Sequence, residues 1–415
     1  MTVRDLSELG ERVRAAARVL GTSSDAQRCD ALRAAAARLR DQASVVLTAN
    51  ASDIERARSD GATTTAIDRL TLSDQRLEAM AQGLETVAML SNPLGERVDS
   101  KTLANGLRVE RVRVPLGVVG IIYENRPNVT SDAAALCLRA ANAAFLRGSS
   151  GALASNQAIV SALRFGLAQA GLPEDAISLV EDVSHETAVH FMQLNGVIDC
   201  LIPRGGPSLI ASMRENATVP YVLDGDGICH VYVDAAANLD MAERIVINAK
   251  VQRPGVCNAM ESLVLHADIA QELLERLSIS MPEVSLLGDE RAVALLPSLH
   301  AAAEGDFDRE FLDLIASVKI VDGLPEAIAF INEHGSGHSE AIVTDDGVAA
   351  EMFLAHVDAA AVLHNASTRF VDGGELGLGA EVGISTQKLH ARGPMGLEAL
   401  TSVRWVIRGE GQVRS

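Results

Sequence analysis

Two patterns of hydrophobic and polar positions divide this chain. Residues 1–92 carry alanine and leucine at helical spacing, and Ser24-Asp25 and Ser73-Asp74 can cap the helical runs 26–40 and 75–90. Further along, short continuous apolar runs alternate with helical patterns. Apolar strands separated by helices are typical of a parallel sheet covered on both faces. We therefore predict an α/β protein with a helical N-terminal region.

The alternation falls into two series. The first is expected to have strands at 118–123, 144–147, 177–180 and 197–203, helices at 131–144, 155–170, 185–194 and 208–216, and a further apolar segment at 219–223. The second runs from about 229 to 370 and is expected to have a helix at 239–251 and strands at 262–265, 317–321, 341–344 and 360–363. Outside both series, residues 98–114 alternate around Asn105-Gly106, a strong hairpin signal, and 400–407 are strand-like. Two α/β domains with a hairpin and a tail are predicted.

Composition narrows the class of protein. The chain has 415 residues, so two or more domains are expected, and 48% apolar residues suffice for their cores. A net charge of −19 argues against a nucleic-acid binder but permits an anionic small substrate. Five cysteines without a CxxC pair predict neither a disulfide framework nor a zinc site, and we expect no metal. A polar N-terminus and the lack of a long apolar run predict a cytoplasmic protein with no membrane contact.

One cysteine stands in a setting suited to nucleophilic chemistry. Cys257 lies in the segment 251–258 (VQRPGVCN), a Pro-Gly turn between a predicted helix and a predicted strand, with Arg253 four residues before it. A reactive thiolate needs stiff backbone, partial exposure and nearby positive charge. The remaining cysteines lie in helical or strand-like apolar runs: Cys29, Cys137, Cys200 and Cys229. Cys257 is therefore the candidate nucleophile, although a free cysteine is often only a buried small hydrophobe.

Two turns that contain glycine follow predicted strands and could meet a phosphate. They are 204–208 (RGGPS) and 147–150 (RGSS). Glycines there let backbone amides approach an anion at a helix N-terminus, although an ordinary strand-to-helix turn has the same pattern. No GxGxxG, P-loop, HExxH or GxSxG motif occurs. The usual Rossmann fingerprint, P-loop kinases, zinc proteases and α/β-hydrolases are therefore poorly supported.

Three polar segments have a density of donors typical of ligand sites. The segment 123–130 (YENRPNVT) follows the first strand of the first series, where α/β proteins place ligands. We expect its polar groups to lie outside the core and to act in function, the alternative being a polar helix cap. The segments 364–369 (HNASTR) and 383–396 (GISTQKLHARGPMG) are similarly polar.

Taken together, these segments resemble the gamma-glutamyl phosphate reductases, or glutamate-5-semialdehyde dehydrogenases, a branch of the aldehyde dehydrogenase superfamily. The matching segments are 115–132 (PLGVVGIIYENRPNVTSD), 201–206 (LIPRGG), 226–234 (DGICHVYVD), 252–261 (QRPGVCNAME), 335–344 (GSGHSEAIVT) and 365–396, which contains STRFVDGGELGLGAEVGISTQKLHARGPMG. They are long, run in order and cover roughly residues 10 to 410. Chance agreement on this scale is negligible.

The resemblance implies an aldehyde dehydrogenase-like fold in three parts. These are a Rossmann-like NADP-binding domain of 1–97 and 115–225, completed by part of 365–398; an α/β catalytic domain of 226–364; and an oligomerisation element of 98–114 and 399–415. It also implies NADPH-dependent reduction of L-glutamyl 5-phosphate to L-glutamate 5-semialdehyde, with release of phosphate, in proline biosynthesis. The resemblance further implies a homo-oligomer. Because no amino-acid kinase motif precedes this region, a separate glutamate 5-kinase is a candidate functional partner.

The resemblance also assigns catalytic roles. Cys257 matches the nucleophile, which would form a thioacyl-enzyme, and Asn125 matches an asparagine of the oxyanion hole. Glu310 matches a glutamate that contacts the nicotinamide ribose. Asp224 stands near the general base of hydrolytic relatives but is one methylene shorter than glutamate, which suits a reductase that releases no acid.

Binding residues follow from the same match. The cofactor-binding candidates are Arg147, Gly148, Ser150, Arg204, Gly205, Gly206 and Glu310, with Ser150 where some relatives carry a lysine near the adenosine ribose. The substrate-binding candidates are Arg126, Asn128, Arg253, Arg369, Ser385, Thr386 and Arg392. Arginine suits the substrate's carboxylate and phosphate because its guanidinium can grip such groups with two parallel hydrogen bonds.

Three other functions remain open from the sequence. A reductase of the same fold could use a different acyl phosphate or a coenzyme A thioester, which the segments 123–130 and 383–396 disfavour. A cysteine hydrolase or amidase would release an acid without any nicotinamide. A non-catalytic binding module on a relic fold would not need Cys257.

Overall fold

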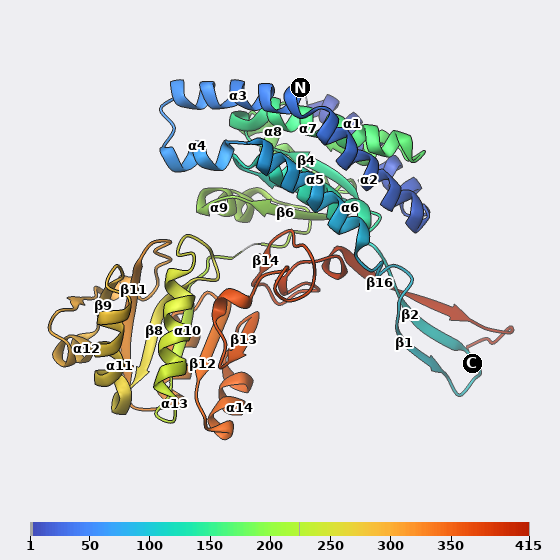
Figure 1. The fold of residues 1–415 in the computed structure, drawn as a ribbon. Coiled ribbons are helices and arrows are strands. Elements are labelled where there is room, and N and C mark those ends of the chain that lie inside the picture. Colours follow the sequence, from blue (N-terminus) through green and yellow to red (C-terminus); the bar gives the residue numbers. More distant parts are fainter. Residues whose placement is uncertain (1–2, 224, 415) are drawn as a thin grey trace. The chain divides into compact units, whose positions relative to one another are not determined.

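The computed structural model describes residues 3–223 and 225–414, which form two compact units (Figure 1). The first unit comprises Met1–Leu223, Gly377–Gly383 and Met395–Ser415, and the second comprises Asp224–Leu376 and Ile384–Pro394. The predicted α/β class is confirmed by the alternation of helices and parallel strands in both units. The second unit extends past the predicted segment 226–364 because residues 365–376 and 384–394 pack with it. Within the described residues, no helix is both long and apolar enough to cross a membrane.

Helices make up most of the first unit. They are α1 (Val3–Leu20), α2 (Asp25–Asp41), α3 (Ala43–Ser59), α4 (Thr64–Leu70), α5 (Asp74–Met89), α6 (Pro127–Arg139), α7 (Leu153–Gln169), α8 (His185–Phe191) and α9 (Pro207–Asn216). Both predicted N-caps are confirmed. The Ser24 hydroxyl accepts the Gln27 N–H at the start of α2, and the Ser73 hydroxyl accepts the Arg76 N–H at the start of α5.

A parallel sheet forms the centre of the first unit. Its strands are β3 (Val118–Tyr123), β4 (Ala143–Arg147), β5 (Ile177–Leu179) and β6 (Cys200–Arg204), in the order β5-β4-β3-β6. The predicted segment 219–223 adds only one bridge, between Leu201 and Tyr221. The helix predicted at 131–144 begins earlier, at Pro127, because proline fits the first turn of a helix. That helix ends at Arg139, and Ala141 follows with a φ of 57°, outside the helical region.

A separate antiparallel sheet contains the predicted hairpin and tail. Its strands are β1 (Arg97–Thr102), β2 (Arg108–Pro115) and β16 (Thr401–Arg408), in the order β1-β2-β16. The hairpin turn is confirmed at Asn105-Gly106, where Gly106 has a φ of 86° and the Asn105 side chain accepts the Leu107 N–H. The strand β1 and the strand β16 are the edges of this sheet.

The second unit is a parallel sheet with a helix layer on each face. Its strands are β7 (Cys229–Val233), β8 (Met260–His266), β9 (Ser285–Gly288), β10 (His300–Ala301), β11 (Ile315–Val321), β12 (Ser339–Val343) and β13 (Ala361–His364), in the order β10-β9-β11-β8-β7-β12-β13. Its helices are α10 (Leu239–Val251), α11 (Ala267–Ser280), α12 (Glu290–Leu295), α13 (Leu324–His334) and α14 (Gly347–His356). The strands β14 (Ile384–Ser385) and β15 (Gly393–Pro394) pair antiparallel.

Alternation along β7 shows how the two faces of this sheet are filled. Val231 and Val233 pack in a core with side chains of α10, α11 and α12, whereas Tyr232 packs with side chains of α13 and α14. Short 3₁₀ turns complete the two units: η1 (Ser150–Ala152), η2 (Glu174–Ala176), η3 (Glu304–Asp306), η4 (Thr368–Phe370) and η5 (Glu398–Leu400). The continuous apolar strands of both sheets are thus explained by burial on two sides.

Candidate active site

Cys257 lies in the turn between α10 and β8. The turn is closed by a hydrogen bond of 3.0 Å from the Ala259 N–H to the Val256 carbonyl. Cys257 is partly exposed, whereas the other cysteines are buried: Cys29, Cys137, Cys200 and Cys229. The structure therefore shows the stiff and accessible setting that the Pro-Gly segment predicts for this residue.

Two residues close to the start of β7, Gly227 and Cys229, hold the Cys257 backbone in place. The Cys229 thiol donates to the Cys257 carbonyl at 3.1 Å. Gly227 packs so closely that a Cβ at this position would lie 1.9 Å from the Cys257 carbonyl oxygen, so only glycine fits. Because β7 begins at Cys229 and β8 at Met260, Cys257 lies at the amino ends of parallel strands. The common rule places ligands at the carboxyl ends.

Glu310 reaches the same place from the segment before β11. One oxygen of its carboxylate accepts the Gly227 N–H at 3.0 Å. Gly227 therefore contacts Cys257 through its α-carbon and Glu310 through its amide. The structure brings together two residues that the resemblance assigns to catalysis and to the cofactor.

Positive charge gathers beside Cys257. Arg369, in η4, donates from Nε to the Gln252 side chain at 2.8 Å. Its pKa is lowered, first by burial and then by the positive charge of Arg253, while the Cys257 sulfur has the opposite effect. Arg369 therefore lies within electrostatic reach of both Arg253 and Cys257. Two guanidinium groups held close together favour binding of an anion, and positive charge near a thiol favours the thiolate.

A buried histidine next to this site was not foreseen in the sequence. His338 precedes β12, its Nδ1 lies 2.8 Å from the Ser339 hydroxyl, and the same nitrogen lies 3.7 Å from the Cys229 sulfur. Burial lowers the pKa of His338 to about 4, so its ring is neutral at neutral pH. Burial also raises the pKa of Cys229 well above its usual value. Cys229 therefore remains a thiol and is poorly suited to act as a nucleophile.

The C-terminal candidates of the second unit lie beside the segments that surround Cys257. Arg392 donates to Asp358 at 2.9 Å and lies near Gly337, where a Cβ would be 3.9 Å from its Nη2. Thr386 packs against Gly225, where a Cβ would be 2.5 Å from the Thr386 hydroxyl. The buried Ser385 hydroxyl accepts the Gln387 N–H at 3.2 Å.

Asn125, Arg126 and Asn128 lie in the first unit, at the carboxyl end of β3. The Asn125 side-chain oxygen accepts the Ser149 hydroxyl, which orients the amide. Asn128 donates to Asp132 at 3.0 Å, and Arg126 is exposed. These residues therefore stand on a polar rim of the first sheet.

The expectation that all of the segment 123–130 lies outside the core is wrong at both ends. Tyr123 and Thr130 are fully buried, with their hydroxyl oxygens 2.7 Å apart. The Thr130 hydroxyl also donates to the Asn156 side chain at 2.9 Å. Because these buried hydroxyls satisfy one another, they belong to the core without a large energetic cost.

The predicted cofactor turns gather at one edge of the first sheet. Gly148 and Ser150 follow β4, and the segment 204–206 ends β6 and leads into α9; β3 lies between these two strands. The Gly206 N–H at the start of α9 donates to the Glu124 carboxylate at 3.0 Å. Arg147 donates from Nη2 to the Val183 and Ser184 carbonyls, at 2.7 and 2.9 Å.

Two further assignments fall elsewhere. Glu310 belongs to the second unit and not to the sheet edge that holds the other cofactor candidates. Asp224, the shorter counterpart of a hydrolytic base, lies outside the described residues.

Comparison with known proteins shows the family to which this chain is similar. A model of the aldehyde dehydrogenase family matches residues 1–305. A gamma-glutamyl phosphate reductase of Heliobacterium modesticaldum is 51% identical over 412 residues, 99% of each chain, and one of Thermobifida fusca is 49% identical over 413 residues, also 99% of each.

Solved structures give the same result. A gamma-glutamyl phosphate reductase of Thermotoga maritima has a TM-score of 0.96 at 43% identity and covers 98% of this chain and 99% of its own. An acetylating aldehyde dehydrogenase of Geobacillus thermoglucosidasius, at 16% identity and a TM-score of 0.70, covers 100% of this chain and 98% of its own and is similar in fold alone. The chain therefore belongs to the aldehyde dehydrogenase family and, within it, to the gamma-glutamyl phosphate reductases.

Proposed function

We propose that this protein reduces L-glutamyl 5-phosphate to L-glutamate 5-semialdehyde with NADPH, releasing phosphate, in proline biosynthesis. Membership of the family implies a nicotinamide cofactor. The observation that carries the proposal is Cys257 in a rigid, partly exposed turn within electrostatic reach of Arg369, in a chain that matches such reductases over its full length.

The chemistry proceeds through Cys257. Its thiolate attacks the acyl carbon of glutamyl phosphate, a C–S bond forms, the C–O bond to phosphate breaks and phosphate leaves with the electron pair. When bound, the reduced nicotinamide would supply the hydride that converts this thioester to the aldehyde level. The C–S bond then breaks and the thiolate is regenerated. Because phosphate is a good leaving group, no strong acid is needed in the first step.

Arg253 and Arg369 supply the charge that this chemistry requires. Arg369 lies in electrostatic reach of Cys257 and of Arg253, and it is partly buried, which strengthens its attraction for an anion. We assign the two arginines to the acyl phosphate, whose negative charge would relieve their mutual repulsion. Arg392, held by Asp358, and the neighbouring Ser385 and Thr386 are assigned to the glutamate end of the substrate.

Oxyanion stabilisation is assigned to the Cys257 backbone amide and to Asn125. Because the Asn125 oxygen accepts the Ser149 hydroxyl, its Nδ2 is the end of the amide that can donate to a developing oxyanion. We also propose that Arg126 and Asn128, which follow on the same rim, help to bind the substrate.

The cofactor is assigned to the sheet edge of the first unit. Gly148, Ser150, Arg204, Gly205 and Gly206 follow neighbouring strands there, as is usual for dinucleotide sites. Arg204 carries a positive charge that can attract a phosphate of the cofactor, and we propose that it favours NADPH over NADH. Glu310 would contact the nicotinamide ribose.

Two features of this edge modify the proposed cofactor site. Glu124 already accepts the Gly206 N–H, so a cofactor phosphate would share the start of α9 with this carboxylate. The Arg147 guanidinium is committed to backbone carbonyls, so we propose that it shapes the turn at Gly148 and Ser150 more than it binds phosphate.

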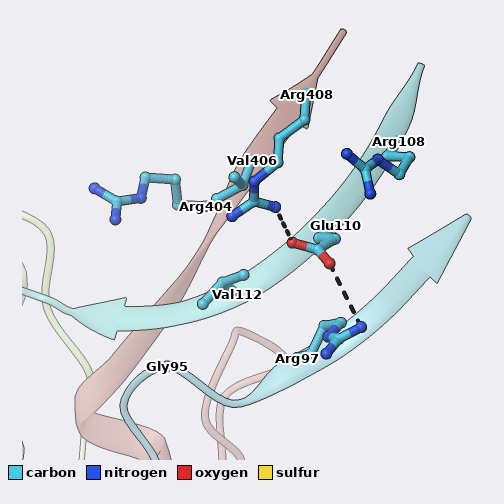
Figure 2. A pocket seen from close by; sticks show the side chains of 8 residues that line it. All are labelled: Gly95, Arg97, Arg108, Glu110, Val112, Arg404, Val406 and Arg408. Atoms are coloured by element: carbon cyan, nitrogen blue, oxygen red, sulfur yellow. Dashed lines mark hydrogen bonds and ion pairs between the residues drawn. The ribbon is translucent and has the colours of Figure 1, made fainter.

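We further propose a homo-oligomer assembled through the sheet of β1, β2 and β16. One face of this sheet has a hollow of about 730 Å³. Figure 2 shows the residues that line it: Gly95, Arg97, Arg108, Glu110, Val112, Arg404, Val406 and Arg408. Alternation along β16 places Val403, Trp405 and Ile407 on the other face, and all three are exposed. Tryptophan and arginine are enriched in protein interfaces, and edge strands tend to find partners.

Light scattering tests this assembly. Trp405→Asp combined with Ile407→Asp should lower the molar mass to that of a smaller species. Val348→Asp, at a 78% exposed position on α14, is the matched control and should not change the mass. A wild-type monomer at micromolar concentration, or a double variant of unchanged mass, would contradict the proposed interface. We also propose a cytoplasmic location, which agrees with the five free cysteines. We propose in addition a functional contact with a separate glutamate 5-kinase.

The reaction itself is tested by NADPH oxidation with glutamyl phosphate generated in situ. Wild-type protein should oxidise NADPH, and Cys257→Ala should lose several powers of ten in turnover while it still binds NADPH. Cys200→Ala, at a buried cysteine, is the matched control and should change stability more than rate. Acid release without NADPH oxidation would indicate a hydrolase, and preference for a coenzyme A thioester would indicate another acylating reductase.

A further inference from the structure

A buried ion pair lies beneath the Cys257 turn. Lys250, in the last turn of α10, donates from Nζ to Glu261 at 2.7 Å, and their side chains are 0% and 1% exposed. Glu261 is the second residue of β8, so the pair joins the helix that leads into the Cys257 turn to the strand that leads out of it. Neither residue was singled out in the sequence, although a glutamate in the apolar run that begins β8 is an unusual feature.

Glu261 also holds a third segment. Its other oxygen, Oε1, accepts the backbone N–H of Leu312 at 3.3 Å. Leu312 has a φ of 55°, a left-handed conformation that is unfavourable for a non-glycine residue. A conformation of this kind persists only where surrounding contacts enforce it, and the Glu261 carboxylate is such a contact.

The segment held by Glu261 bears directly on the nucleophile. Glu310, two residues before Leu312, accepts the Gly227 N–H, and Gly227 packs on the Cys257 backbone. The Leu312 carbonyl lies 3.6 Å from the position of a Cβ on Gly255, in the turn that precedes Cys257. The loop 310–312 therefore contacts the Cys257 region from two directions.

We propose that the Lys250–Glu261 pair is a positioning device for the reductase site. By accepting the Leu312 N–H, Glu261 fixes the loop 310–312, which sets the place of Glu310 and, through Gly227 and Gly255, of the Cys257 turn. Lys250 keeps the Glu261 carboxylate oriented with Oε1 toward that loop. The inference rests on the proposed roles of Cys257 and Glu310.

The charges around the pair are consistent with this role. Burial raises the pKa of Glu261 to about 7, and Lys250 and the backbone N–H groups of Leu312 and Phe311 oppose that rise. Burial lowers the pKa of Lys250, against the attraction of Glu261 and Asp313. A buried ion pair seldom adds net stability over an apolar pair of similar volume. Orientation of Oε1 is therefore the better reason for charges at this place.

Two double variants separate orientation from charge. Lys250→Met with Glu261→Met replaces the pair by apolar side chains of similar length, which a core commonly tolerates. Lys250→Met with Glu261→Gln also removes both charges but keeps an oxygen that can accept the Leu312 N–H. Three readouts are compared: NADPH affinity by fluorescence titration, the rate of Cys257 alkylation by iodoacetamide, and kcat with KM for each substrate.

We expect the Met/Met variant to fold and to lose about 10–100-fold in kcat/KM, with weaker NADPH binding and a changed alkylation rate, because displacements near 1 Å cost this much. The Met/Gln variant should regain most of the loss. In a Glu310→Ala background, which removes the acceptor of the Gly227 N–H, the further loss caused by Met/Met should shrink to about threefold or less, because the two changes act on one contact chain.

Equal behaviour of the Met/Met and Met/Gln variants would overturn the proposal, as would a Met/Met loss of the same size with and without the Glu310 carboxylate. If Met/Met does not fold, Lys250→Met with Glu261→Leu replaces it in the same comparison. NADPH affinity and alkylation are measured without turnover. These two measurements therefore test the positioning role independently of the proposed reaction. If the proposed reaction is wrong, the Cys257→Ala variant will remain active.

Discussion

Gly227→Ala is the most demanding test of the geometry at Cys257. A Cβ on residue 227 would lie 1.9 Å from the Cys257 carbonyl oxygen, 2.4 Å from its carbonyl carbon and 2.5 Å from its α-carbon. All three atoms are backbone, so no side chain can rotate away. Contacts of this type are essentially never shorter than 3.0 Å, so the two segments must separate by more than 1 Å.

The expected cost follows from that displacement. Overpacking of this kind typically costs about 1–3 kcal/mol of unfolding free energy. A shift of 1 Å in a catalytic group can lower the rate by about 100-fold. Because Gly227 also donates to Glu310, the same shift should weaken cofactor binding. We therefore expect a folded enzyme with kcat lower by about two powers of ten.

Steady-state kinetics and urea unfolding measure the two effects. Gly347→Ala is the matched control, since it makes the same chemical change in the same unit at a position with no atom within 4 Å of the new Cβ. The control should keep wild-type kcat and stability. If Gly227→Ala keeps kcat within about threefold of wild type, the close packing of Gly227 on Cys257 does not govern catalysis, and the reasoning from this contact fails.

Two further predictions concern the cofactor and the buried histidine. The wild-type enzyme should have a higher kcat/KM with NADPH than with NADH. Arg204→Ala should reduce that preference by about tenfold or more, because a charged contact is lost. Equal kcat/KM values for the two cofactors in the wild type would contradict the proposed role of Arg204. Because burial lowers the pKa of His338 from 6.5 to about 4, the unfolded chain takes up a proton first as the pH falls. The neutral His338 ring therefore makes its full contribution to the free energy of unfolding above about pH 6.5. Up to about 3 kcal/mol of that contribution is lost as the pH falls toward 4. His338→Gln should lose less stability over this range in urea unfolding, and an unchanged slope would contradict the buried neutral imidazole.

The elements of the fold could be predicted well from the sequence, and their boundaries less well. The helix α10 was predicted at its observed bounds because an apolar face, a polar N-cap and a Pro-Gly turn all mark it. The sequence pattern predicts the start of α6 four residues late because the polar segment 123–130 is typical of a ligand site, although Pro127 begins a helix readily.

The candidate site could be predicted only in part, because its contacts link distant segments. The local Pro-Gly turn identified Cys257, and the resemblance supplied Glu310. Nothing local in the sequence shows that Gly227 joins them, since the contact depends on the order of strands in the sheet. The pair of Lys250 and Glu261 was missed because a charged residue in a helix or strand is usually exposed, and its burial depends on tertiary packing.

A glutamyl thioester on Cys257 is the intermediate expected of this enzyme, and peptide mass spectrometry after an acid quench detects it. Glutamate semialdehyde and NADP⁺ are mixed with the enzyme in phosphate-free buffer, with sulfate at matched ionic strength as a control for added phosphate. We expect one glutamyl group on the peptide that contains Cys257. This group should be lost when phosphate is added, and it should be absent in Cys257→Ala. Sustained NADPH formation without phosphate, with free glutamate as product and no adduct on Cys257, would contradict the account.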